Sequence, residues 1–157
     1  MTDVTESWFW EGNVVETIVR RLEQDGWSIV SKADTRSKEQ GIDIHAAKNG
    51  KALLIEAKGY PSTTYRDPRR AGQIKPTNPT LQAKHWYSHA LLKAVQLQTE
   101  YPDAIIALGF PNFPRYRNLF EETKIGLQKL GVAVLAVSED GKVVEWKYPQ
   151  TGTVVFA

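Results

Sequence analysis

Apolar and polar residues alternate along the first third of the chain in patterns that predict one helix followed by three strands. Apolar side chains recur at helical spacing over residues 11–22, and Gly26 then ends this helix. The dipeptide Asn49-Gly50 favours a tight turn between two antiparallel strands. The strands are expected at residues 27–33, 42–48 and 51–58.

The remainder of the chain alternates between helical patterns and short apolar runs. A loop rich in proline, residues 59–79, precedes a helix over residues 80–99. The expected inner positions of that helix are Leu81, His85, Ala90, Leu92 and Val95. The later elements are a buried strand at 104–110, a helix at 115–130, a buried strand at 132–137 and a short strand at 143–146. The order α-β-β-β-α-β-α-β-β predicts an α/β fold with a mixed β-sheet flanked by helices.

Length and composition are those of one globular domain. The chain has 157 residues, of which 41% are hydrophobic and 24% charged, so residues 1–157 are expected to form a single domain. It contains no cysteine, which excludes disulfide frameworks, thiolate zinc sites and cysteine nucleophiles. No segment reads as a signal peptide or is apolar over a bilayer's width, so we expect a cytoplasmic protein with no membrane partner.

Two acidic residues and one lysine are brought together by the expected hairpin. Glu56 and Lys58 are two residues apart on one strand, so their side chains point to the same face of the sheet. Asp43 lies on the neighbouring strand, and the turn places it near Glu56 across the ladder. Two carboxylates therefore converge with one ammonium group.

This group of side chains could support phosphodiester hydrolysis with Mg²⁺. The ion prefers oxygen ligands and keeps several waters, so one or two carboxylates and a substrate phosphate are enough to hold it. It lowers the pKa of a bound water, while a neighbouring lysine stabilises negative charge on the phosphate. The alternative is a solvated sheet face with a weak cross-strand ion pair. The apolar run that leads into Glu56 indicates a buried strand and favours the first interpretation.

The arrangement resembles the PD-(D/E)XK nuclease superfamily, which has the restriction-endonuclease-like fold. Asp43 and the tripeptide Glu56-Ala57-Lys58 match its motif, although Gly41-Ile42 stands where the motif has a proline before the aspartate. The segment VVETIVRRLEQDGWSIV is similar to the first helix and strand of the type IV restriction endonuclease and archaeal Holliday-junction resolvase groups. The resemblance covers residues 11–58 by motif and extends to Val137 by the order of elements.

The resemblance implies a role for each matching residue. Asp43, Glu56 and the backbone carbonyl of Ala57 would be ligands of Mg²⁺, for which Mn²⁺ can substitute. Lys58 would be the catalytic lysine. Glu16 matches a helix glutamate that often completes the metal site, unless it is an ordinary surface residue. Glu11 is the less favoured glutamate, because it stands at the helix start.

The helix at 80–99 begins with further candidates. Gln82 is similar to a catalytic glutamine that, in the exonuclease branch of the superfamily, precedes a tyrosine by four residues; here the fourth position is Trp86. Gln82 and Lys84 are expected to face the site or else to form a polar helix start. His85 and His89 have a spacing that can bind zinc, but the sequence offers no third ligand nearby, so we expect them to pack the helix.

A local basic segment follows the candidate site, although the net charge of the whole chain is only +2. This segment, residues 65–84, contains a single acidic residue, and its basic residues are Arg66, Arg69, Arg70, Lys75 and Lys84. Such side chains would bind DNA phosphates without sequence preference and in a salt-dependent manner. The alternative is a solvated loop without a ligand.

The sequence therefore predicts a Mg²⁺-dependent deoxyribonuclease that acts as an endonuclease. One alternative is a nucleic-acid- or partner-binding module of the same fold whose site does not cut, and another is a nuclease directed at RNA. No separate sequence-reading domain is evident. A homodimer, a structure-selective enzyme, or a nuclease guided or activated by a protein partner would each fit this organisation.

Overall fold

The computed structural model describes residues 4–33, 41–62, 78–147 and 155–156. The helical elements are the 3-10 turn η1 (Val4–Glu6) and the helices α1 (Glu11–Gln24), α2 (Pro79–Glu100) and α3 (Pro114–Leu130). The strands are β1 (Ser28–Lys32), β2 (Ile44–Lys48), β3 (Lys51–Ala57), β4 (Ile105–Pro111), β5 (Val132–Val137) and β6 (Val143–Glu145). Their order confirms the predicted succession of helices and strands, to which the structure adds η1.

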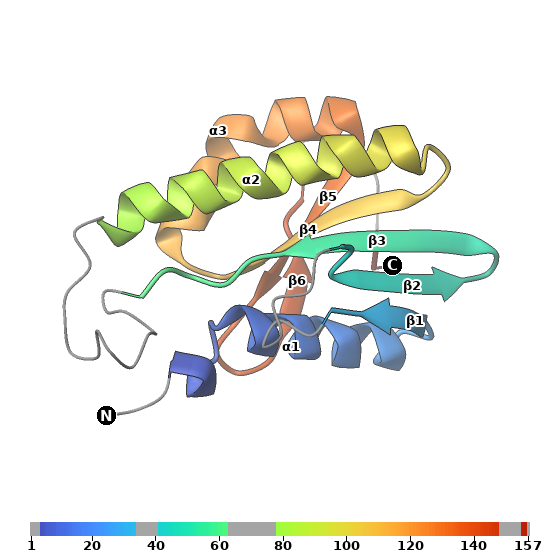
Figure 1. The fold of residues 1–157 in the computed structure, drawn as a ribbon, viewed down its shortest axis with the longest axis horizontal. Coiled ribbons are helices and arrows are strands. Elements are labelled where there is room, and N and C mark those ends of the chain that lie inside the picture. Colours follow the sequence, from blue (N-terminus) through green and yellow to red (C-terminus); the bar gives the residue numbers. More distant parts are fainter. Residues whose placement is uncertain (1–3, 34–40, 63–77, 148–154, 157) are drawn as a thin grey trace.

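The six strands form one mixed sheet in the order β1-β2-β3-β4-β5-β6. The pairs β1–β2, β2–β3 and β5–β6 are antiparallel, whereas β3–β4 and β4–β5 are parallel. The parallel pairs arise because α2 connects β3 to β4 and α3 connects β4 to β5, each as a crossover. Figure 1 shows α1 on one face of the sheet and α2 and α3 together on the other. The predicted α/β fold with a mixed sheet flanked by helices is confirmed.

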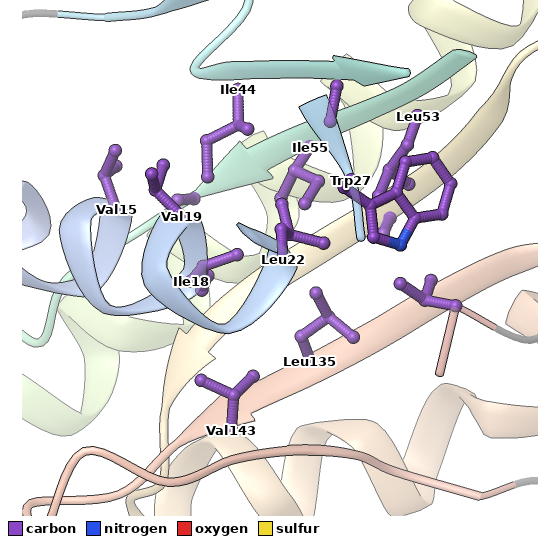
Figure 2. Close-up of a cluster of buried hydrophobic side chains, with 14 of the residues drawn as sticks. Val15, Ile18, Val19, Leu22, Trp27, Ile44, Leu53, Ile55, Leu135 and Val143 are labelled. Atoms are coloured by element: carbon purple, nitrogen blue, oxygen red, sulfur yellow. The ribbon is translucent and has the colours of Figure 1, made fainter. Parts of the chain in front are cut away.

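Each face of the sheet has its own apolar core. In Figure 2, Ile18 and Leu22 of α1 lie against Ile55 and Leu135 of the sheet, and all four are buried. The opposite core packs α2 and α3 against the other face, and Leu54 of β3 points into it. Side chains of β3 thus alternate between the two cores, which determines the face that each later residue of the strand presents.

The hairpin between β2 and β3 forms as predicted. Asn49 and Gly50 have positive φ angles of 52° and 76°, which a tight two-residue turn of this kind requires. The resulting register pairs Ile44 with Ile55. Because the turn is short, this register leaves no freedom to shift the end of β2 along β3.

α2 packs on the sheet with a different face from the predicted one. Its buried residues are Ala83, Tyr87, Ala90, Ala94 and Leu97, so only one of the five expected inner positions is buried. Leu81, Leu92 and Val95 are 49%, 57% and 37% exposed. The prediction was wrong because apolar residues occur on both sides of this helix, and the alanine side lets the helix approach the sheet more closely.

Candidate active site

Asp43 and Glu56 face each other across the hairpin. The pairing of Ile44 with Ile55, continued by one residue, brings these two carboxyl groups opposite one another. Glu56 points towards the α2 side of the sheet, because its neighbours Ile55 and Ala57 belong to the α1 core. Glu56 is only 8% exposed. Its side chain shares a hydrogen bond with that of Asp43, so the structure brings together the two acids that the hairpin pattern singled out.

The backbone at the end of β3 holds Asp43 in place. The Ala57 N–H donates a 2.8 Å hydrogen bond to Asp43 Oδ2. The N–H and C=O groups of one strand residue point to the same neighbouring strand. The Ala57 carbonyl is therefore directed to the side of β3 on which Asp43 lies, where it is a possible third oxygen ligand.

Lys58 follows β3 directly and remains with Glu56. The two side chains form an ion pair with 3.4 Å between Lys58 Nζ and Glu56 Oε1, and they are 21% and 11% exposed. The Lys58 N–H donates a 2.9 Å hydrogen bond to the carbonyl of Gly109 on β4. The backbone of Lys58 is thus held against β4, while its ammonium group retains access to solvent.

Glu11, at the first turn of α1, joins the same cluster. Its carboxyl group lies within the electrostatic range of Asp43 and Lys58. Close backbone packing positions it: a Cβ on Gly59 would lie 2.6 Å from the Phe9 carbonyl oxygen and 2.7 Å from the Glu11 nitrogen. Glycine at position 59 therefore allows the chain that leaves β3 to lie directly against the start of α1.

Glu16 lies elsewhere. Its carboxylate pairs with Lys32 of β1 at 2.8 Å between Lys32 Nζ and Glu16 Oε1, and both side chains are almost half exposed. The structure thus puts Glu11, and not the favoured Glu16, beside Asp43. The helix start counted against Glu11 in the sequence, yet this is the part of α1 that packs against the end of β3.

The N-terminal half of α2 forms the opposite wall of the site. A pocket of about 410 Å³ is lined by Glu11, Lys58, His85, Trp86 and His89. Both histidines are exposed, so the expectation that they pack the helix was wrong. They were misplaced because the face of α2 that meets the sheet could not be read from its apolar residues.

Other predicted residues of α2 divide between two faces. Gln82 lies one turn before Trp86, and its Oε1 atom is buried without a hydrogen-bond partner in the described part of the chain. Lys84 is exposed and does not line the pocket. Lys93, two turns beyond Trp86, exerts its charge on Asp43. The four remaining basic candidates, Arg66, Arg69, Arg70 and Lys75, lie outside the described residues.

Burial and mutual repulsion hold protons on the acids of the cluster. Desolvation, followed by the charge of Asp43, raises the pKa of Glu56 to about 8. The same two causes raise the pKa of Glu11 to about 7. Burial also raises the pKa of Asp43, although the hydrogen bond from Ala57 opposes this. At neutral pH the Asp43–Glu56 pair therefore retains a proton, which a bound cation would displace.

The donor set fits a hard divalent cation held by few protein ligands. Within the described ranges, no three side chains of His, Cys, Asp or Glu are grouped closely enough to hold a metal ion. What the structure provides is the paired carboxyl groups of Asp43 and Glu56, with the Ala57 carbonyl beside them. Mg²⁺ is commonly bound by one or two carboxylates and completes its shell with water and phosphate oxygens.

Sequence reasoning ranked Glu11 below Glu16 and missed Lys93, although the helical spacing carried a signal for each. Glu11 precedes Val15, Ile18 and Leu22 at spacings of four, seven and eleven residues, which puts it on the buried face of α1. Lys93 follows Trp86 by seven residues and therefore lies on the same face of α2. In both cases the spacing from other residues of the helix indicates the face on which the side chain lies better than its distance from the helix end does.

The mixed sheet with α1 on one face and α2 and α3 on the other is a restriction-endonuclease-like α/β fold. A fdxN element excision controlling factor protein from Anabaena variabilis shares it with a TM-score of 0.51 and 18% identity, over 87% of this chain and 96% of that chain. An XisH family protein from Nostoc punctiforme PCC 73102 matches with a TM-score of 0.51 and 16% identity, over 86% of this chain and 98% of that one.

Identities this low establish a common fold and not a common activity. No protein-family model matches the sequence, and neither does any curated protein. Among the described segments, no helix is both long enough and apolar enough to cross a membrane.

Proposed function

We propose that this protein is a Mg²⁺-dependent nuclease that hydrolyses phosphodiester bonds in DNA as an endonuclease. The observation that carries the proposal is the convergence of Asp43, Glu56 and Lys58 at the end of β3, beside an open pocket. An acidic pair that is buried and still reachable from solvent is costly to a fold. Its retention next to a lysine is explained by a cation and an anionic substrate that bind there together.

Each residue has a role that follows from its position. Asp43, Glu56 and the Ala57 carbonyl would hold Mg²⁺, or Mn²⁺ in its place. When bound, the ion would polarise the phosphate and acidify a water molecule. Lys58 would donate hydrogen bonds to a phosphate oxygen and offset the negative charge that develops there. Glu11 borders the pocket and would orient the attacking water by accepting a hydrogen bond from it.

Substrate affinity would come from the basic residues that follow the candidate site in the sequence. Arg66, Arg69, Arg70, Lys75 and Lys84 are proposed to contact DNA phosphates. Exchanging Arg69 and Arg70 for alanine is then expected to weaken DNA binding and to reduce its salt dependence, whereas unchanged affinity would contradict this role. Because one site cuts one strand, double-strand cleavage would require a homodimer or a partner protein.

Two other functions use the same fold. One alternative is a module that binds DNA or a partner without cutting; one structural neighbour is an fdxN element excision controlling factor protein, which is compatible with such a role. A nuclease directed at RNA is the second alternative, since the metal chemistry discriminates little between the two sugars. Parallel cleavage assays on DNA and RNA, with a binding assay on the same oligonucleotides, distinguish the three.

The decisive experiment is cleavage of single-stranded, double-stranded and branched DNA with Mg²⁺ or Mn²⁺. Lys58→Ala and Asp43→Ala are expected to lower the rate by at least about a hundredfold while remaining folded. Lys142→Ala is a matched control, because Lys142 is a lysine with a side chain 79% exposed that pairs only loosely with Asp140 at 3.7 Å. Wild-type protein that binds DNA and never cuts would contradict the nuclease and leave the binding module.

A further inference from the structure

One row of residues on α2 lies beside the face of the helix that packs on the sheet. It is made of four residues that each directly precede a buried residue of the helix, namely Gln82, Trp86, His89 and Lys93. Their spacings of four, three and four residues place them in one row along the helix. The row is next to the face of α2 that packs on β3 and β4. It therefore lies near the end of β3, where Lys58 follows the strand.

This row of α2 lies across a pocket from the acidic cluster. Trp86 and His89 line the 410 Å³ pocket together with Glu11 and Lys58, and His85 stands beside them on the preceding turn. Lys93 exerts its charge on Asp43. The pocket therefore has an aromatic and imidazole wall on α2, and the candidate catalytic groups on the opposite side.

We propose that this pocket binds one unpaired nucleotide next to the phosphate that is cut, with the base stacked on Trp86 and its phosphate bound by His85 and His89. The inference rests on the proposed function and specifies its substrate as DNA that contains an unpaired nucleotide. The volume is that of a small-ligand pocket. The indole offers a flat apolar surface for a base, and imidazoles supply hydrogen-bond donors for phosphate oxygens.

The preference for an unpaired nucleotide follows from the geometry of stacking. A base inside a duplex is stacked on both faces, so it can meet Trp86 only after it has left the helix. Leaving the stack is easiest at a bulge, a branch or a single-stranded segment. A wall that stacks on a base beside Lys58 therefore favours those substrates over a continuous duplex.

The test is DNA binding measured by fluorescence anisotropy with Ca²⁺ in place of Mg²⁺, so that affinity is read without depending on cleavage. Three short DNAs are compared: a paired duplex, the same duplex with one bulged nucleotide, and the bulge with its base removed. Wild-type protein is expected to bind the bulge about tenfold more tightly than either of the other two. Trp86→Ala should abolish this preference, and Trp86→Phe should retain most of it.

Tyr101→Ala is the matched control, because Tyr101 is an aromatic residue 40% exposed at the far end of α2. It should bind all three DNAs as the wild type does. Equal affinity of the wild type for the paired, bulged and abasic DNAs would overturn the inference and leave the proposed nuclease intact. Failure to bind any DNA would overturn both. If Trp86→Ala does not fold, the abasic DNA and Trp86→Phe still decide the question with folded protein.

Discussion

Gly59 and Glu11 are in direct backbone contact: a Cβ at position 59 would lie only 2.7 Å from the Glu11 nitrogen. This contact joins the segment that leaves β3 to the first turn of α1. Glu56 and Lys58 lie just before Gly59 in the chain, and Glu11 carries its carboxyl group at the start of α1. The geometry of the candidate site is therefore fixed by an approach of two backbones that only glycine permits.

Gly59→Ala is expected to destabilise the protein by about 1–3 kcal/mol, because both nearby atoms are backbone and cannot move aside alone. Chemical denaturation measures the change. Gly126→Ala on α3 is the matched control: its Cβ would meet nothing within 4 Å, so it should stabilise by up to about 1 kcal/mol through helix propensity. Equal effects of the two substitutions would show that the contact at Gly59 is unimportant.

Exchange of the two α1 glutamates separates their roles. Glu11→Gln should lower DNA cleavage by about a hundredfold, because the carboxylate borders the pocket and Lys58. Glu16→Gln should leave the rate within about threefold, since its carboxylate pairs with Lys32 on the solvent side. Single-turnover cleavage rates measure both effects. The reverse ranking would restore Glu16 as the functional glutamate.

Glu56 should make the metal-free protein less stable as the pH rises. The carboxyl releases its proton near pH 4.5 when unfolded but only near pH 8 in the fold, so the folded state is favoured at low pH and loses that advantage across this interval. Glu56→Gln carries no such proton. Between about pH 5 and about pH 9, the free energy of unfolding should therefore fall by a few kcal/mol more in the wild type than in this variant.

Denaturation in EDTA over this pH range measures the difference. Glu121→Gln is the control, because its carboxylate is exposed and neighbouring Lys124 and Arg117 lower its pKa. That group is ionised throughout the interval, so its removal should leave the slope unchanged. A slope that is the same in wild type and Glu56→Gln would contradict the assignment of the raised pKa to Glu56.

Mg²⁺ should stabilise the folded protein. At a concentration about tenfold above its Kd, we expect Tm to rise by about 3 °C. The rise should be larger at alkaline than at mildly acidic pH, because the pKa of Glu56 is raised to about 8 and protons compete with the ion. Differential scanning fluorimetry checks this. Asp43→Asn should lose the rise, and an undiminished rise in that variant would place the ion elsewhere.

Tyr116 of α3 holds the segment around Gly59 in place. Its buried hydroxyl donates a 2.7 Å hydrogen bond to the Gly59 carbonyl. Tyr116→Phe should cost about 1–3 kcal/mol, because it leaves that carbonyl without its partner. Tyr101→Phe, at an exposed tyrosine, should cost less than about 0.5 kcal/mol. Thermal or chemical unfolding of the two variants gives the comparison, and equal losses would refute the role of the hydrogen bond.

Local signals were enough to predict the elements and the acidic pair. Periodicity separates helices from strands because side chains on each have a fixed angular spacing. The turn at Asn49 and Gly50 then determines the hairpin register, since two residues leave only one way to close it. With that register, Asp43 must oppose Glu56, and alternation brings Lys58 to the same face. All of these relationships extend over fewer than about twenty residues.

Contacts between distant segments decided the rest. Glu11 and not Glu16 lies near Asp43 because α1 begins beside the segment that leaves β3, where Gly59 packs against the backbone of Phe9 and Glu11. Likewise, α2 has apolar residues on two sides, so only its docking through Ala83, Ala90 and Ala94 turned Trp86 and His89 towards the pocket. The sequence by itself determined the strand hairpin and its carboxylates, because short-range geometry controls them. The tertiary structure decided which parts of the helices surround them, because that depends on close packing between segments far apart in the chain.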